Sequence, residues 1–227
     1  MTLKCLLFDF DGLILNTEEP GFEAWLENYR AYGADLPLET YVKCVGSDFN
    51  GFDPKSHLES LVDTPVDWQF WDAEREKLAL SMIEKLEPLP GILDLIKEAE
   101  AAGIPCLVAS SSPRSWVGGH LDRLGLTSRF QAIRCLEDVA SPKPAPDLFQ
   151  SAAKAAGVEP RDSLVLEDSL NGLIAATAAG APCVVVPNRI TRHLDFAGAS
   201  SVLPSLDGIG IDILGEIHRK CARPQDF

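Results

Sequence analysis

The chain has 227 residues, of which 46% are hydrophobic and 24% charged, a balance typical of a globular protein with a sizeable core. Its 34 acidic and 20 basic residues give a formal net charge of -14, which would repel a phosphate backbone over most of the surface. The negative net charge argues against nucleic acid as a partner. The sequence leaves open whether the chain is a monomer or a weak homodimer.

Two apolar stretches bear on cellular location. Residues 5–8 directly precede Asp9 and are too few for the core of a signal peptide. Residues 169–188 carry no charge, but Gly180 and Pro182 interrupt them, so a helix, a turn and a strand fit better than a membrane span. We therefore expect a cytoplasmic protein without a membrane partner.

Strand-like apolar runs alternate with helical patterns along most of the chain. Strands are predicted at residues 3–8, 105–110, 131–135, 163–167 and 183–187. Helices are predicted from apolar periodicity around residues 92–99, 116–124, 148–156 and 170–177, with ends at Gly103, Gly125, Gly157 and Gly180. This alternation predicts an α/β fold with a doubly wound, Rossmann-like parallel sheet.

One interval interrupts the alternation. Residues 17–86 contain helical patterns but no convincing buried strand, so we expect an inserted α-helical cap domain there. The core domain would then comprise residues 1–16 and 87–227, with hinges at the two junctions. Within the cap, the helical spacing around Trp25 favours a core position over a ligand platform. The loop at residues 45–54 either connects helices or faces the substrate.

The six cysteines form no C-x-x-C pair, and several lie in apolar strand-like runs. This pattern favours buried free thiols over metal ligands or disulfides.

Polar side chains follow four of the predicted elements. They are Asp9 and Asp11, Ser110, Lys143, and Glu167 with Asp168. Because ligands of open α/β sheets bind beyond the carboxyl ends of the strands, these four stretches are expected to meet at one edge. Crowded carboxylates repel one another unless a divalent cation lies among them, and oxygen ligands in this number favour Mg²⁺.

A phosphoryl-transfer reaction fits this set of residues. With Mg²⁺ offsetting the charge repulsion, Asp9 can attack phosphorus and form an aspartyl-phosphate. Asp11, two residues on in extended backbone, points to the same side and can protonate the leaving oxygen and then deprotonate water. Lys143 supplies a fixed positive charge, while the Ser110 hydroxyl and nearby backbone N–H groups can bind phosphoryl oxygens.

These stretches resemble the four ordered motifs of the haloacid dehalogenase superfamily. The matching segments are D-F-D-G at 9–12, V-A-S-S-S at 108–112, K-P-A-P-D at 143–147 and L-E-D-S at 166–169. The likeness covers nearly the whole chain. The helical insertion resembles the cap of the β-phosphoglucomutase-like branch, which includes phosphatases for sugar phosphates and related metabolites.

The resemblance implies a role for each motif residue. It implies Asp9 as nucleophile, Asp11 as acid and base, and Ser110 and Lys143 as phosphate binders. It also implies Mg²⁺ held by Asp9, the Asp11 backbone carbonyl and Asp168, with Glu167 nearby.

The serine-rich segment after the second predicted strand adds candidates. We add Ser111 and Arg114 as possible phosphate or substrate contacts. The same segment also reads as a helix start, with Ser112 as N-cap and Pro113 in the first turn.

Three departures from the family pattern bear on function. Gly21 and Phe49 stand where mutases of that branch carry a cap histidine and a cap arginine, and Asn16 replaces a common aspartate. We therefore expect a Mg²⁺-dependent phosphomonoester hydrolase acting on a small phosphorylated metabolite, with a phosphosugar mutase as the alternative. A non-catalytic phosphate-binding protein and a halide-removing enzyme are both disfavoured, since neither would need Asp11 beside the nucleophile.

Overall fold

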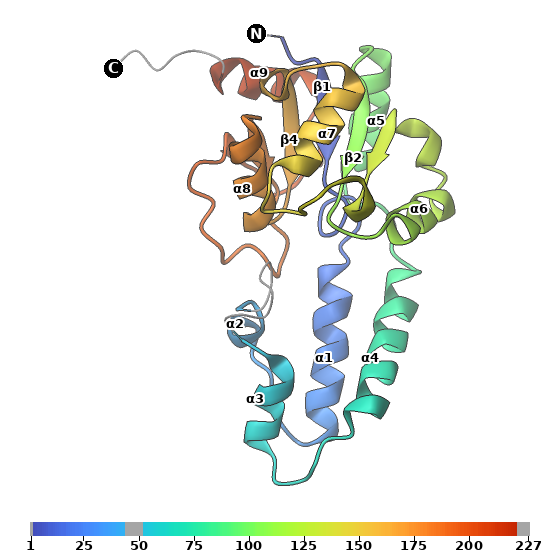
Figure 1. Cartoon of the computed structure of the whole chain (residues 1–227), viewed down its shortest axis with the longest axis vertical. Helices are drawn as coiled ribbons and strands as arrows, with labels where there is room; N and C mark the ends of the chain where they lie inside the picture. The colour runs from blue at the N-terminus through green and yellow to red at the C-terminus, as the bar shows by residue number, and fades with distance from the viewer. Residues whose placement is uncertain (1, 44–51, 222–227) are drawn as a thin grey trace.

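A six-stranded parallel sheet forms the centre of the larger half of the molecule, in the order β3-β2-β1-β4-β5-β6 (Figure 1). The computed structural model describes residues 2–43 and 52–221. The strands are β1 (Cys5–Phe8), β2 (Cys106–Ala109), β3 (Ala132–Arg134), β4 (Ser163–Glu167), β5 (Cys183–Val185) and β6 (Ser201–Val202). All strand pairs are parallel, so their carboxyl ends share one edge.

The central strands are buried on both faces because helices cover the sheet on each side. Side chains of β1 alternate, with Leu6 and Phe8 in one hydrophobic cluster and Cys5 and Leu7 in the other. The first cluster includes residues of α5 (Ile92–Ala101), α6 (Arg114–Arg123) and α9 (Ile211–Cys221). The second includes residues of α7 (Asp147–Ala156) and α8 (Leu170–Ala179). Short 3₁₀ helices lie at Thr127–Arg129, Leu136–Asp138 and Pro160–Asp162.

The register of the three central strands sets the position of the functional residues. Phe8 lies opposite both Val108 and Leu166 in the parallel ladder. The backbone N–H of Asp9 continues this ladder by donating to Leu166 O at 2.9 Å. Polar residues just after β1, β2 and β4 therefore emerge at the same level of the sheet.

Four helices lie below the sheet in Figure 1 and are called the helical segment from here on. They are α1 (Glu18–Ala31), α2 (Leu38–Tyr41), α3 (Pro54–Leu61) and α4 (Trp68–Ile83). Their shared interior contains Phe22, Trp25, Tyr29, Leu36 and Leu58. The core position expected for Trp25 is confirmed, since its side chain is buried in this cluster.

The chain enters and leaves the helical segment at neighbouring points. Before α1, the backbone of residues 11–15 forms a compact turn in which Gly12 N donates to Leu15 O at 2.7 Å. After α4, Leu89 N donates to Ile14 O at 2.9 Å. The segment that returns from α4 therefore contacts the segment that leads into α1.

The predicted α/β sheet is confirmed, with small differences in the bounds. All five predicted strands are present, each starting or ending within two residues of its predicted range. Strand β6 and helix α9 were not predicted: β6 has two residues at the sheet edge, too short for an alternating pattern to be visible. No helix in the described part of the chain is both long and apolar enough to cross a membrane.

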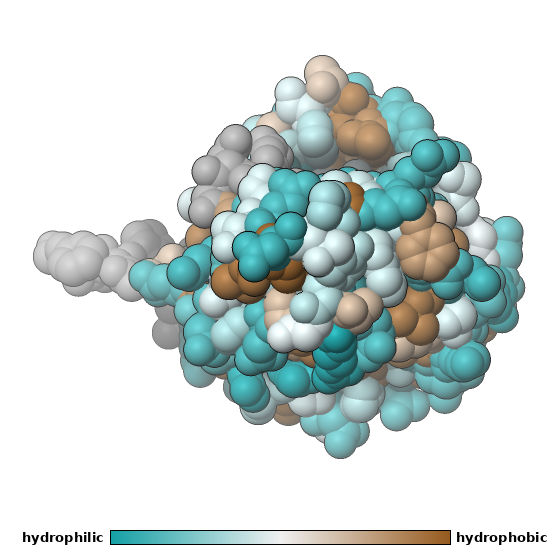
Figure 2. Space-filling view, turned by 90° about the horizontal axis from the view of Figure 1, so that it is seen from below, coloured by the Kyte–Doolittle hydropathy of each residue, from teal (hydrophilic) through white to brown (hydrophobic). Residues whose placement is uncertain are grey.

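The surface at the far end of the helical segment is mainly hydrophilic. Figure 2 shows this end with hydrophobic side chains in separate patches.

Among the described cysteines, Cys5, Cys106, Cys135 and Cys183 are buried free thiols, as predicted, whereas Cys221 is exposed. Burial raises the pKa of the Cys5 thiol to about 12, which keeps it protonated and unreactive at neutral pH.

Candidate active site

A hollow of about 220 Å³ opens at the carboxyl edge of the sheet, where the sheet faces α1. It is lined by Asp9, Asp11, Glu18, Ser110, Ser111, Ser112, Lys143, Asp168, Ser169, Asn171 and Thr191. The convergence expected from the sequence therefore occurs: the segments after β1, β2 and β4, together with the Lys143 loop, supply most of this lining.

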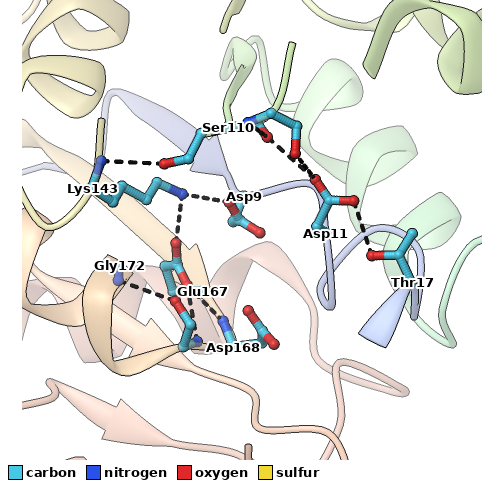
Figure 3. Close-up of polar contacts among 11 residues, drawn as sticks. Asp9, Asp11, Thr17, Ser110, Lys143, Glu167, Asp168 and Gly172 are labelled. Carbon is cyan, nitrogen blue, oxygen red and sulfur yellow. Dashed lines mark hydrogen bonds and ion pairs between the residues drawn. The ribbon is translucent and has the colours of Figure 1, made fainter. Parts of the chain in front are cut away.

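Lys143 is the buried positive charge of the site. Its ammonium group bonds to Asp9 Oδ1 and lies 2.6 Å from Glu167 Oε1, with only 5% of the side chain exposed (Figure 3). Burial by itself would lower the pKa of this ammonium, but the carboxylates of Asp9 and Glu167 outweigh burial and raise it. Lys143 is therefore charged at any physiological pH.

Glu167 is fully occupied by protein donors. Oε1 accepts from Lys143, and Oε2 accepts from the backbone N–H of Asp168 at 2.9 Å and from the N–H and hydroxyl of Ser169 at 3.0 and 2.9 Å. A Cβ atom at position 172 would lie 1.8 Å from Glu167 Cδ, so only glycine lets α8 approach this carboxylate. Glu167 thus orients Lys143 and the start of α8.

Asp168 is held from two sides. Its Oδ2 accepts from Asn188 Nδ2 at 2.7 Å, and the backbone of Gly12 packs directly against the same carboxylate. Gly12 has φ +86°, and a Cβ there would lie 2.1 Å from Asp168 Oδ2. A side chain at position 12 would be both strained and in collision with Asp168.

Three buried carboxylates have the chemistry of a site for a hard cation. One oxygen from each of Asp9, Glu167 and Asp168 lies within 4.8 Å of the others. The pKa of Asp9 is raised well above its usual range by burial and then by the charge of Glu167, despite the opposing effect of Lys143. The pKa of Asp168 is raised in the same direction, again by burial first and by Glu167 next. One ammonium does not balance three carboxylates, and a divalent cation with oxygen ligands would do so.

Asp11 lies beside this group in a different environment. Oδ1 accepts from the Thr17 hydroxyl and from the Trp116 indole N–H, each at 2.9 Å. Oδ2 accepts from the Ser112 hydroxyl at 2.6 Å, with the Ser110 hydroxyl at 3.5 Å (Figure 3). Its direct partners are neutral donors, whereas those of Asp9 include an ammonium group. The two aspartates, separated only by Phe10, are therefore suited to different tasks.

The comparisons with known proteins match this arrangement. The family model described as "Haloacid dehalogenase-like hydrolase" matches residues 6–186, which is more than half of the chain. The chain belongs to the haloacid dehalogenase-like hydrolase family. The prediction of an enzyme of the hydrolase class is thereby confirmed.

Relatives within the haloacid dehalogenase-like family span nearly the whole chain. One relative is YhcW of Bacillus subtilis (strain 168), which is provisionally named a phosphatase. It is 38% identical over 213 residues, covering 93% of this chain and 96% of that one. A crystal structure of CbbY from Rhodobacter sphaeroides in complex with phosphate is 30% identical, with a TM-score of 0.69 and coverage of 94% and 99%. A CbbY variant has been solved with xylulose-(1,5)bisphosphate; it is 29% identical, with a TM-score of 0.67 and the same coverage.

Solved structures of lower identity share the fold. A Thermotoga maritima structure provisionally described as a β-phosphoglucomutase is 22% identical, with a TM-score of 0.75 and coverage of 94% and 99%. At this identity the likeness shows the fold alone.

The serines expected to bind phosphate lie at the hollow. Ser110 is 1% exposed, and its hydroxyl accepts from Ser112 N at 3.0 Å. Ser111 Oγ accepts from Lys143 N at 3.2 Å, which ties the lysine loop to the segment after β2. The alternative interpretation of Ser112 as helix N-cap is wrong: the N-cap of α6 is Pro113, and the Ser112 hydroxyl donates to Asp11 instead.

Arg114 is not among the residues that line the hollow. Its guanidinium pairs with Asp138 and donates to Ile133 O at 3.3 Å, while its backbone N–H donates to the Glu137 carboxylate. These contacts fasten the start of α6 to the Leu136–Asp138 turn. A role in substrate binding stays a prediction that this geometry does not support.

Several residues of the site were not predicted. Glu18, the first residue of α1, brings the helical segment to the hollow, and burial followed by the charge of Asp11 raises its pKa to about 7. Thr17, Trp116 and Asn188 act through hydrogen bonds to Asp11 and Asp168. Trp116 was placed correctly in a helical pattern, and the need of a half-buried indole N–H for an acceptor was the one available signal.

The positions that depart from the family pattern lie mostly away from the hollow. Asn16 lines a separate hollow of about 250 Å³ with Leu89 and Pro187. Gly21 lies in the first turn of α1, where a Cβ would meet only the Tyr41 hydroxyl at 3.5 Å. Phe49 and most of the 45–54 loop fall outside the described residues. The described end of that loop contains Asp53, which caps α3.

Proposed function

We propose that this hydrolase is a Mg²⁺-dependent phosphatase that cleaves a small phosphorylated metabolite through an aspartyl-phosphate on Asp9. The observation that carries the proposal is the pairing of two aspartates with contrasting environments at the end of β1. Asp9 lies among buried charges, and Asp11 is held by neutral donors. The relative YhcW, whose name designates a phosphatase, supports the same reaction class. The CbbY structure in complex with phosphate also supports it.

The proposed cation ligands are Asp9, Asp168 and the backbone carbonyl of Asp11. When bound, Mg²⁺ supplies the positive charge that lets an anionic nucleophile approach an anionic phosphate. Glu167 has both oxygens taken by protein donors, so its part is to hold Lys143 and the backbone of Asp168 in place.

Asp9 performs the first displacement. Because Lys143 occupies Oδ1, we assign the attack on phosphorus to Oδ2. The bond between phosphorus and the ester oxygen breaks as the bond to Asp9 forms, and protonated Asp11 gives its proton to the leaving oxygen. Lys143 and the Ser110 hydroxyl stabilise the charge that builds on the phosphoryl oxygens.

Asp11 then acts as a base in the second displacement. It takes a proton from water as the water oxygen attacks phosphorus, which releases inorganic phosphate and regenerates Asp9. Hydrogen bonds from Thr17, Trp116 and Ser112 keep the Asp11 carboxylate oriented between its two proton transfers.

We infer that the substrate is a phosphorylated sugar or a similar small metabolite. The hollow of about 220 Å³ is lined mainly by hydroxyl, carboxylate and amide groups, which suit a hydroxylated substrate better than an apolar one. The CbbY structure containing xylulose-(1,5)bisphosphate supports this class by similarity. Residues 17–86 are proposed to act as the cap domain that covers the substrate, and a cytoplasmic location stays a prediction from the sequence.

The decisive experiment measures phosphate release by the purified full-length chain. A panel of phosphorylated sugars, polyols and nucleotides is assayed with Mg²⁺, with EDTA, and with the Asp9→Asn variant. We expect release only with Mg²⁺ and wild-type protein, and a phosphorylated sugar among the best substrates. Release that survives both EDTA and Asp9→Asn would contradict the mechanism.

A second assay separates hydrolase from mutase. The enzyme is incubated with Mg²⁺ and β-glucose 1-phosphate, with and without glucose 1,6-bisphosphate as a primer. We expect no primer-dependent isomerisation, because the first turn of α1 offers Gly21 where a second catalytic group would be needed. A mutase of this type would also need a cation that binds a second phosphate group, and Lys55 of α3 is paired with Asp72 at 2.6 Å. Rapid primer-dependent formation of glucose 6-phosphate would establish the mutase instead.

A further inference from the structure

A short turn after β5 touches both the acidic site and the interior of the helical segment. The turn comprises residues 188–191 and is called the 188–191 turn. In Figure 1 the orange-red loop that contains it extends from the sheet down toward α2. Its two ends make contacts of different kinds, one polar and one hydrophobic.

The polar end is Asn188. Its Nδ2 donates to Asp168 Oδ2 at 2.7 Å, while its Oδ1 accepts from Ile190 N at 2.8 Å and from Thr191 N at 3.1 Å. The amide therefore has one orientation, because reversing it would set an oxygen against the carboxylate and an NH₂ group against two N–H groups. Gly12 closes the remaining space, since a Cβ there would lie 3.0 Å from Asn188 Nδ2.

The hydrophobic end is Ile190. Its side chain is completely buried in the cluster formed by residues of the helical segment such as Phe22 and Tyr29. Its neighbour Arg189 lies 3.5 Å from Glu23 of α1. A residue that belongs to the sheet half of the chain thus completes the interior of the helical segment.

Further hydrogen bonds hold the 188–191 turn in one conformation. Thr191 is 1% exposed, and its hydroxyl oxygen accepts from Asn188 N at 3.1 Å. Arg192 N donates to Asn188 O at 3.0 Å. With the two bonds to Asn188 Oδ1, these contacts leave little freedom for Ile190 to move without Asn188. A displacement of the helical segment that carries Ile190 therefore pulls on the group that holds Asp168.

We propose that the 188–191 turn couples the packing of the helical segment to the cation-binding geometry of Asp168. Asn188 is the positioning residue and Ile190 is its anchor. The inference rests on the proposed function in taking Asp168 as a Mg²⁺ ligand. Because such coupling is reciprocal, cation binding also strengthens the packing of the helical segment against the sheet half.

Calorimetric titration of Mg²⁺ into the metal-free full-length chain tests the coupling without turnover. Asn188→Ala is expected to weaken affinity by roughly 10- to 100-fold, the usual effect of removing a group that orients a metal ligand. Ile190→Ala is expected to weaken it by roughly 3- to 10-fold through the turn. Leu58→Ala, an equally buried position of the same cluster, is the matched control: it lowers the melting temperature but changes affinity by less than about twofold.

The double variant decides whether the two residues act through one connection. In Asn188→Ala/Ile190→Ala, affinity should equal that of Asn188→Ala alone, because the anchor no longer reaches Asp168. Losses that simply multiply, or wild-type affinity in Ile190→Ala, would overturn the coupling. If Ile190→Ala does not fold, Ile190→Val takes its place in the same cycle.

Amide hydrogen exchange gives an independent measurement. Mg²⁺ should slow exchange in α1 and α4 of the wild type and have a smaller effect in Asn188→Ala. Equal effects in both proteins would contradict the coupling. A wild-type chain that binds no Mg²⁺ would instead contradict the proposed function, so the two failures are distinguishable.

Discussion

Lys143 in the sheet half and Lys55 in the helical segment both pair with carboxylates, but the two pairs differ in their exposure to solvent. In the sheet half, Lys143 bridges Asp9 and Glu167 with 5% of its side chain exposed. In the helical segment, Lys55 pairs with Asp72 with 38% and 39% of the two side chains exposed. The first pair is held where water cannot screen it, which is what stabilising a transition state requires, whereas the second contributes little.

The helical segment is held together by aromatic and apolar packing instead. The Arg75 guanidinium lies 3.9 Å from the centre of the Trp25 ring, and Trp68 packs edge-on against the same ring. Such contacts depend on volume and shape, so they tolerate replacement better than a fixed set of charges. Under the proposed function the reacting groups all come from the sheet half, while the helical segment contributes Glu18 to the lining of the hollow.

The largest expected effect is that of Asp9→Asn. Removing the nucleophile should lower turnover by at least about 1,000-fold, because no other carboxylate occupies its position. The melting temperature should change less than in a Lys143 variant, since Lys143 keeps Glu167 as a partner and burial already disfavours the charged form of Asp9. Phosphate release and thermal unfolding are measured on the same preparation, with Asp94→Asn on the surface of α5 as control. Full activity in Asp9→Asn would contradict the assignment of the nucleophile.

Replacing Lys143 by Met tests the contrast between buried and exposed charge directly. Leaving Asp9 and Glu167 without their partner should cost about 3–5 kcal/mol in the free energy of unfolding, in addition to lost activity. Lys55→Met in the helical segment should cost only about 0–1 kcal/mol. Denaturant unfolding of both variants gives the two values. Equal costs would mean that the burial of Lys143 has no energetic consequence.

Trp116→Phe keeps an aromatic ring beside His120 and removes one donor from Asp11. An intramolecular hydrogen bond contributes about 0.5–1.5 kcal/mol, so turnover should fall by roughly two- to tenfold. The Mg²⁺ concentration for half-maximal activity should stay the same, because Asp168 is untouched. A rise in that concentration with unchanged turnover would show that Trp116 acts on the cation site instead.

The smallest effect is expected at Glu18, where the two halves meet. Its pKa is raised from 4.5 to about 7 by burial and by Asp11, so folding favours the protonated form. The stability that Glu18 contributes is complete below about pH 4.5 and is lost as pH rises through about 7. Glu18→Gln should therefore raise the melting temperature at pH 8 more than at pH 5. Glu19→Gln is the neighbouring control, and a pH-independent difference for Glu18→Gln would refute the shift.

The sequence predicts the sheet half well because its signals are local. Apolar runs mark the strands, and glycines such as Gly157 and Gly180 end helices with positive φ, as predicted. Asp9 and Asp168 directly follow strands, and Lys143 lies in the loop between β3 and α7. The common direction of the parallel strands brings these residues together. Their convergence needs only the order of the elements, not the details of packing.

The missed residues depend on contacts between distant parts of the chain. The Trp116 indole reaches an acceptor 105 positions away, and Asn188 holds a carboxylate 20 positions away. The sequence around Ile190 is typical of a loop, yet Ile190 is buried because residues of α1 and α3 pack around it. Periodicity reports which side of a helix is buried but not which partner buries it, so none of these contacts is visible in the sequence.

The contact between Leu89 N and Ile14 O, at 2.9 Å, has a consequence for how such enzymes diversify. Since the outgoing and returning chain lie side by side, the intervening stretch closes on itself, and its length adds little to the entropy cost of folding. A recombination event that replaces this stretch leaves the strand register intact. Such a replacement must bring its own donor to Asp11 in place of Thr17 and its own packing around Ile190, since both contacts come from the exchanged stretch.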